Sequence, residues 1–63
     1  MVQIVVKHDG PKEFEAVIQL KEKGIPVFKE SRILRENESA IMFLKRGTTI
    51  MIEERRIDRR TKD

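Results

Sequence analysis

The second half of the chain, residues 27–57, consists of apolar runs of strand length that short turn sequences separate. The first half offers a single segment with a helical pattern. Because a sheet has two faces and one helix covers only one of them, a fold built from these elements leaves a sheet face without a cover. What covers that second face is the question that most constrains this chain.

Length and composition narrow the answer. With 63 residues, the chain forms one small domain, and such a domain buries only about 60% of the surface that its unfolded chain exposes. The sequence has no cysteine, so neither disulfides nor thiolate metal sites can stabilise it. Oligomerisation is the remaining way to add stability. The apolar run Val2–Val6 is too short for a signal-peptide core or a membrane span, and we expect a cytoplasmic protein without membrane contact.

The segment 11–23 has the signals of a helix. Pro11 suits the first helical position, and Phe14, Val17, Ile18 and Leu20 form an apolar stripe at helical spacing. Gly24 suits a left-handed C-cap, and Pro26 blocks continuation of the helix. We therefore predict a helix over residues 11–23 and a positive φ at Gly24.

The remaining segments read as strands. Alternation over residues 2–7 predicts the first strand, and residues 27–36 keep an extended character. Apolar doublets at 27–28 and 33–34 require either a bulge near Glu30–Ser31 or burial on both faces at the strand ends. Runs at 40–44 and 49–57 predict two further strands, joined by a tight turn in which Gly47 takes positive φ.

These elements give an α+β fold of order β-α-β-β-β in a single domain, residues 1–57. A right-handed βαβ unit with parallel strands is followed by an antiparallel hairpin, and the helix packs on one face of a four-stranded mixed sheet. Residues 58–63 form a charged tail that we expect to fray.

The sheet face opposite the helix is the predicted interface. Apolar residues occupy both faces of each strand, whereas a sheet with one wet face shows a clean alternation. The side chains predicted to lie on the uncovered face are Val5, Leu34, Met42, Leu44 and Met51. An uncovered apolar layer of this kind is typical of a protein–protein interface. The sequence thus predicts a non-enzymatic interaction module that forms a homodimer or other homo-oligomer, or docks a protein partner.

Nucleic-acid binding is the alternative function. The net charge is +3, and the basic residues that could contact phosphates are Lys29, Arg32, Arg35, Lys45, Arg46, Arg55 and Arg56. Against this, residues 53–63 hold five basic and four acidic side chains, so the charge is mixed. The chain also lacks Trp and Tyr, which single-strand binders use to stack bases.

Catalysis has little support in the sequence. His8 is the only histidine, and with Asp9 it could form a general base at the end of the first strand. Neither Ser31 nor Ser39 lies in a nucleophile motif, and no spacing suits a metal or a phosphate-binding loop. We therefore predict no enzyme activity, no catalytic residues, no metal and no cofactor.

Overall fold

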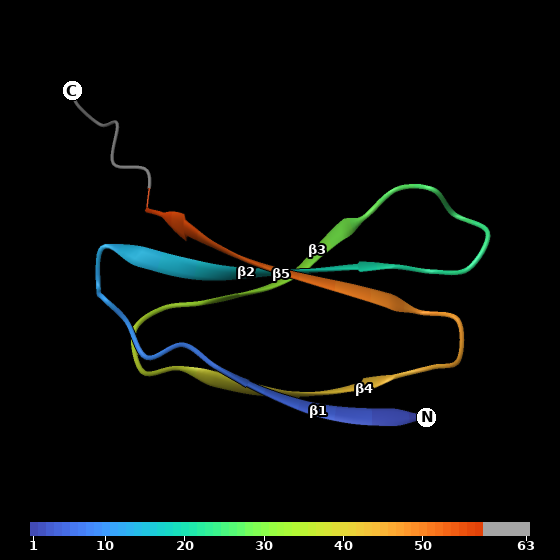
Figure 1. Ribbon diagram of the computed structural model, residues 1–63, viewed down its shortest axis with the longest axis horizontal. Helices are drawn as coiled ribbons and strands as arrows, with labels where there is room; N and C mark the ends of the chain where they lie inside the picture. The colour runs from blue at the N-terminus through green and yellow to red at the C-terminus, as the bar shows by residue number, and fades with distance from the viewer. Residues whose placement is uncertain (58–63) are drawn as a thin grey trace.

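The computed structural model describes residues 1–57, and these contain five strands and no helix. The strands are β1 (Val2–Lys7), β2 (Phe14–Lys21), β3 (Lys29–Leu34), β4 (Ser39–Leu44) and β5 (Thr49–Arg56). They form a two-stranded sheet, β1-β4, and a three-stranded sheet of order β3-β2-β5, and every pairing is antiparallel. Figure 1 shows the two sheets as separate layers whose strands run along the long axis of the molecule.

The predicted α+β fold is therefore wrong, because the segment expected to form the helix is β2, the central strand of the larger sheet. Phe14, Ala16, Ile18 and Leu20 also satisfy an alternating pattern, and Val17 and Ile18 are β-branched. An isolated helix of about 13 residues is marginal in water. As a strand, the same segment gains main-chain hydrogen bonds on both sides, from β3 and from β5.

The predicted parallel βαβ crossover and the C-terminal hairpin are wrong for the same reason. Without a helix, β2 returns through the loop at residues 22–28 to pair antiparallel with β3. A tight turn joins β4 to β5, but β4 pairs with β1 and β5 pairs with β2. The turn therefore carries the chain from one sheet to the other.

Several local predictions are confirmed. Between Ile18 and Gln19 the register against β3 shifts, and Ser31 is the residue left without a partner. This is the bulge predicted near Glu30–Ser31. Gly24 and Gly47 have φ of 87° and 90°, as predicted, although Gly24 lies in a β-turn closed by the Ile25 N–H on the Glu22 carbonyl rather than at a helix end. The prediction for the tail, residues 58–63, lies outside the described residues.

The core lies between the two sheets. The fully covered side chains are Ala16 and Ile18 from β2, Leu34 from β3 and Ala40 from β4, and the half-buried Val6, Met42 and Ile50 pack against them. Each sheet thus covers the inner face of the other, which answers in part the question that the sequence raised. Val17 is also buried but points to the opposite face of β2, between its cross-strand neighbours Ile33 and Glu53.

The two turn glycines give a matched stability prediction. A Cβ at Gly24 would meet no atom within 4 Å, so Gly24→Ala should cost only the strain of positive φ, about 1 kcal/mol. A Cβ at Gly47 would lie 3.1 Å from Lys23 Cβ, and Gly47→Ala should therefore cost more. Urea unfolding of the two variants measures the difference, and equal costs would contradict the close packing of Gly47 on Lys23.

Candidate interaction surface

The outward face of the β1–β4 sheet carries three exposed apolar side chains. Val5 lies opposite Ile41, and Phe43 lies opposite Gln3 on the same face. The exposed fractions of Val5, Ile41 and Phe43 are 66%, 58% and 61%. We refer to these three residues as the outer patch. Contiguous exposed apolar residues of this kind mark an interaction surface more often than scattered ones do.

The structure separates the five residues predicted to form the interface. Val5 belongs to the outer patch, and Met51 is 40% exposed on β5, in the other sheet. Met42 is half-buried and packs on the core. Leu34 and Leu44, with 2% and 8% exposure, are buried within the chain itself and offer no surface to a partner.

Sequence reasoning missed Ile41 and Phe43 because it assigned Met42 and Leu44, rather than these two residues, to the outward face of residues 40–44. The flanking residues hold the signal. Ser39 and Lys45 share the alternation of Ile41 and Phe43, whereas Ala40, Met42 and Leu44 form a wholly apolar set. The set with polar ends faces the solvent.

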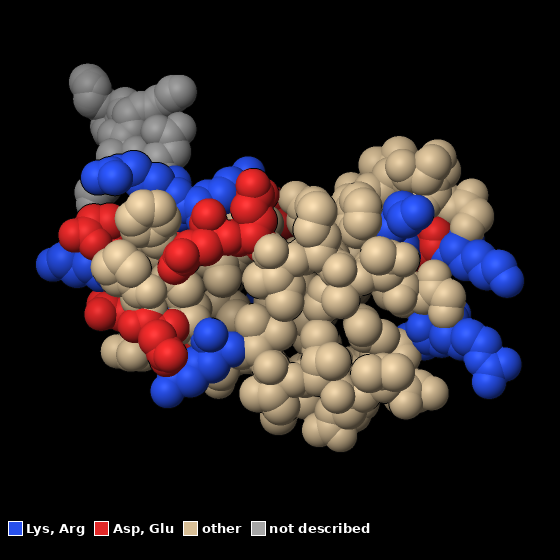
Figure 2. Space-filling model, viewed as in Figure 1, with Lys and Arg blue, Asp and Glu red and all other residues tan. Residues whose placement is uncertain are grey.

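The basic residues predicted to contact nucleic acid do not form one stripe. Lys45 and Arg46 lie in the turn between β4 and β5, and Arg55 and Arg56 lie at the far end of β5. Lys29 and Arg32 belong to β3, on the edge of the larger sheet. In Figure 2 the end of the molecule with the β5 C-terminus shows acidic and basic side chains side by side.

Two of these arginines already have partners within the chain. Arg35 Nε lies 3.2 Å from Glu15 Oε1, and the guanidinium of Arg56 lies over the Phe14 ring, 5.7 Å from its centroid. Such contacts hold a cation close to the protein and lower its availability to a phosphate.

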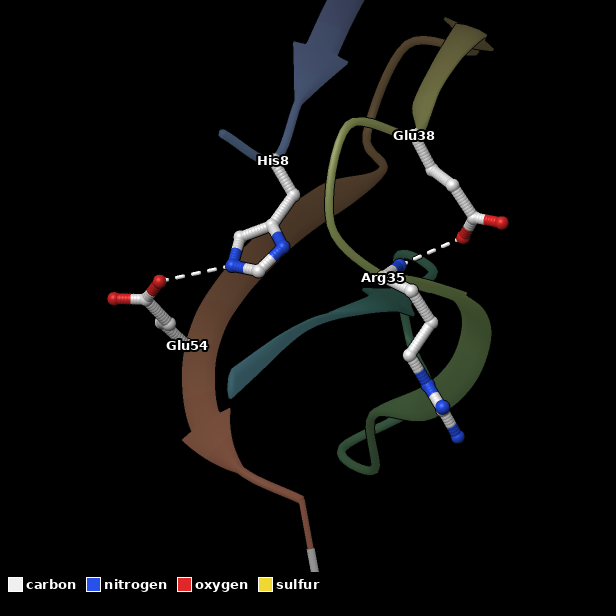
Figure 3. Close-up of polar contacts among 4 residues, drawn as sticks. All are labelled: His8, Arg35, Glu38 and Glu54. Atoms are coloured by element: carbon white, nitrogen blue, oxygen red, sulfur yellow. Dashed lines mark hydrogen bonds and ion pairs between the residues drawn. The ribbon is translucent and has the colours of Figure 1, made fainter. Parts of the chain in front are cut away.

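His8 and Glu54 form a polar bridge between the sheets. His8 follows β1 on the alternation of Val2, Ile4 and Val6, so its side chain points inward, where it is 5% exposed. Its Nε2 donates to Glu54 Oε2 on β5 at 2.9 Å (Figure 3), and Nδ1 has no hydrogen-bond partner among residues 1–57. The main chain of His8 also continues the β1–β4 pairing, since its N–H donates to the Glu38 carbonyl.

The bridge offers little to catalysis. The imidazole is buried, so a substrate cannot reach it, and Glu54 is half exposed and engaged with it. Within residues 1–57, no serine or threonine hydroxyl is hydrogen-bonded to the pair. Over the same residues, no group of three or more His, Asp and Glu side chains could hold a metal ion.

The environment of His8 favours its protonated form. The hydrogen bond to Glu54 raises the pKa of His8 above its ordinary value, and burial opposes this effect. The Arg35 backbone and the negative charges of Glu54 and Asp9 raise the pKa further. The net direction is upward.

Because His8 is the only histidine, a single imidazole signal reports this pKa in an NMR titration. We expect a midpoint above about 6.5, the value of an unperturbed histidine. Glu54→Gln should lower the midpoint. Glu53→Gln, on the neighbouring residue that points to the other face, is the matched control and should change it less. A wild-type midpoint at or below 6.5 would contradict the bridge.

The free energy of unfolding should depend on the protonation of His8. A folded-state pKa above the unfolded value stabilises the fold fully below about pH 6.5, and the effect is lost as the pH rises through the folded pKa. The difference in unfolding free energy between wild type and Glu54→Gln should therefore be largest below about pH 6.5 and shrink as the pH rises above this value. Urea unfolding at several pH values on both sides of it measures the difference. A constant difference would show that the bridge stabilises the fold independently of the proton.

The chain matches no protein-family model, no curated protein and no solved structure. Residues 1–57 contain no helix that could cross a membrane.

Proposed function

We propose that the protein is a small non-enzymatic interaction module that self-associates through its β1–β4 sheet. The observation that carries this proposal is the outer patch, with three large apolar side chains more than half exposed on one sheet face. Burying apolar surface contributes roughly 25 cal/mol per Å², so a second copy that covers part of this patch stabilises the protein.

The size of the domain supports a second copy as the partner. Within residues 1–57, the buried hydrophobic core consists of six side chains, two of which are alanines. A two-stranded sheet is marginal by itself, and β1-β4 packs on the larger sheet through one face only. Self-association adds burial to the less supported of the two sheets, in a chain that has no disulfide.

Nucleic-acid binding has weaker support as an alternative. Lys45 and Arg46 lie at one end of the molecule and Arg55 and Arg56 at the other, with acidic residues among them (Figure 2). A phosphate backbone would meet mixed charge rather than a basic groove. The cytoplasmic location expected from the sequence stays a prediction.

The central test is Phe43→Lys. Phe43 is 61% exposed, so the variant should stay folded, whereas a lysine in a buried patch should weaken association. Loss of one hot-spot side chain, about 2 kcal/mol, raises the dimer Kd by roughly thirtyfold. Sedimentation equilibrium measures the Kd, and circular dichroism checks the fold.

Two control variants sharpen this test. Ile33→Lys changes an apolar residue of β3 that is 38% exposed on the larger sheet, and this variant should associate like wild type. Met42→Lys changes the neighbour of Phe43 that faces the core, and it should unfold. A wild type that remains monomeric at millimolar concentration would overturn the proposed function.

A further inference from the structure

The edges of the two sheets differ in how they are protected. Exposed strand edges invite pairing with other chains, and charges or bulges on an edge strand discourage it. In the larger sheet, β3 carries Lys29, Glu30 and Arg32 together with the bulge at Ser31, and β5 ends in the run 53–56 of four charged residues. In the smaller sheet, β1 contains one charge, Lys7, and β4 contains none. The strand β4 is thus the least protected edge of the described structure.

The main chain of β4 has free groups on that edge. The His8 N–H donates to the Glu38 carbonyl, so the pair 8–38 is a hydrogen-bonded pair of the antiparallel ladder. Such pairs alternate along a ladder, and Ala40, Met42 and Leu44 therefore bond to β1. The N–H and C=O groups of Ser39, Ile41 and Phe43 point to the other edge, where no strand of the described chain pairs.

The charges that flank β4 have opposite signs at its two ends. Glu36 and Glu38 precede the strand, and Lys45 and Arg46 follow it. An antiparallel pair of two β4 strands centred on Ile41 places the turn at residues 35–38 of one copy beside the turn at residues 45–48 of the other. By the symmetry of the pair, the acidic turn of each copy then lies beside the basic turn of its partner. In Figure 2 the end with the β4–β5 turn shows mainly Lys and Arg, and the acidic side chains gather toward the opposite end.

We propose that β4 pairs antiparallel with β4 of a second copy, centred on Ile41, so that the two small sheets form one four-stranded sheet of order β1-β4-β4-β1. The interface is isologous, as in most homodimers. It extends the outer patch across the dimer axis, because the two Ile41 side chains lie side by side and Phe43 lies opposite Ser39. This inference rests on the proposed self-association through the β1–β4 sheet and specifies the edge of β4 as the contact between copies, with the outer patch on the outward face of the joined sheet.

Charge reversal tests the register. Glu36→Lys and Arg46→Glu each reverse a charge in one of the two turns that face each other across the dimer, and each should weaken self-association about tenfold at low salt. An equimolar mixture of the two variants should form a heterodimer with a Kd near that of wild type, because unlike charges face each other again. Lys29→Glu, which changes the net charge in the same way as Arg46→Glu but lies on β3 in the other sheet, is the matched control and should leave the Kd unchanged.

Amide hydrogen exchange gives a second, independent readout on the wild type. The amides of Ser39, Ile41 and Phe43 should become protected as the protein concentration rises through the Kd. The amides of Gln3 and Val5, which by the same alternation face the outer edge of β1, should exchange at the same rate at every concentration.

The outcomes separate this inference from the proposed function. A dimer that Phe43→Lys disrupts, but whose Kd is the same in both charge variants and whose Ile41 amide stays unprotected, would overturn the strand pairing and leave self-association through the sheet face intact. A wild type that is monomeric at millimolar concentration would overturn both. Recovery in the mixture together with protection at Ile41 supports the paired β4 strands.

Discussion

The double pairing of β2 is the interaction on which the rest of the structure depends. Phe14–Lys21 bonds to β5 along its whole length and to β3 along most of it, and it places Ala16 and Ile18 in the core. Ile18 is fully buried, and Ala16 shares its cluster with Ala40 from the other sheet. Two alanines at this level leave little side-chain volume between the layers, which allows the small sheet to pack close to the large one.

Two turns and one side-chain contact connect the two sheets. The turns at residues 35–38 and 45–48 join β4 to strands of the other sheet, and each has its third residue at positive φ, Asn37 and Gly47. At the end of β1, His8 reaches Glu54 across the gap between the sheets. A protonated imidazole and a carboxylate at this position couple the packing of the two layers to pH, whereas an apolar contact would not.

The sequence allowed the strands to be predicted better than their arrangement. Residues 2–7, 40–44 and 49–57 were correctly predicted as strands, because β-branched alternation and turn residues are local signals. Segment 14–21 satisfies both a helical stripe, through Phe14, Val17 and Ile18, and an alternating pattern, through Ala16 and Leu20. Nothing within those residues decides between the two. The decision comes from β3 and β5, which lie far along the chain and supply the hydrogen bonds.

Two residues of the candidate surface were wrongly assigned for a similar reason, because their assignment depends on which element packs on the other sheet face. Because a helix was expected to cover one sheet face, the outward set was placed at Met42 and Leu44, and these two residues instead face the second sheet. Only the polar ends of the alternation, Ser39 and Lys45, distinguish the outer set from the inner one. An uncovered apolar face could therefore be predicted from the apolar pattern of the strands. The residues on that face could be assigned only with knowledge of what packs on the other face.

The size of the chain links the fold to the surface. Five strands of six or eight residues divide into sheets of two and three, and each sheet buries one face against the other. The smaller sheet then has an outer face and two edges to protect with few residues, and β4 has neither a charge nor a bulge within its span. Val5, Ile41 and Phe43 lie where a single copy leaves apolar surface in water. A second copy aligned along β4 would satisfy the free main-chain groups and place the acidic turn of each copy beside the basic turn of its partner, so two independent features favour the same partner.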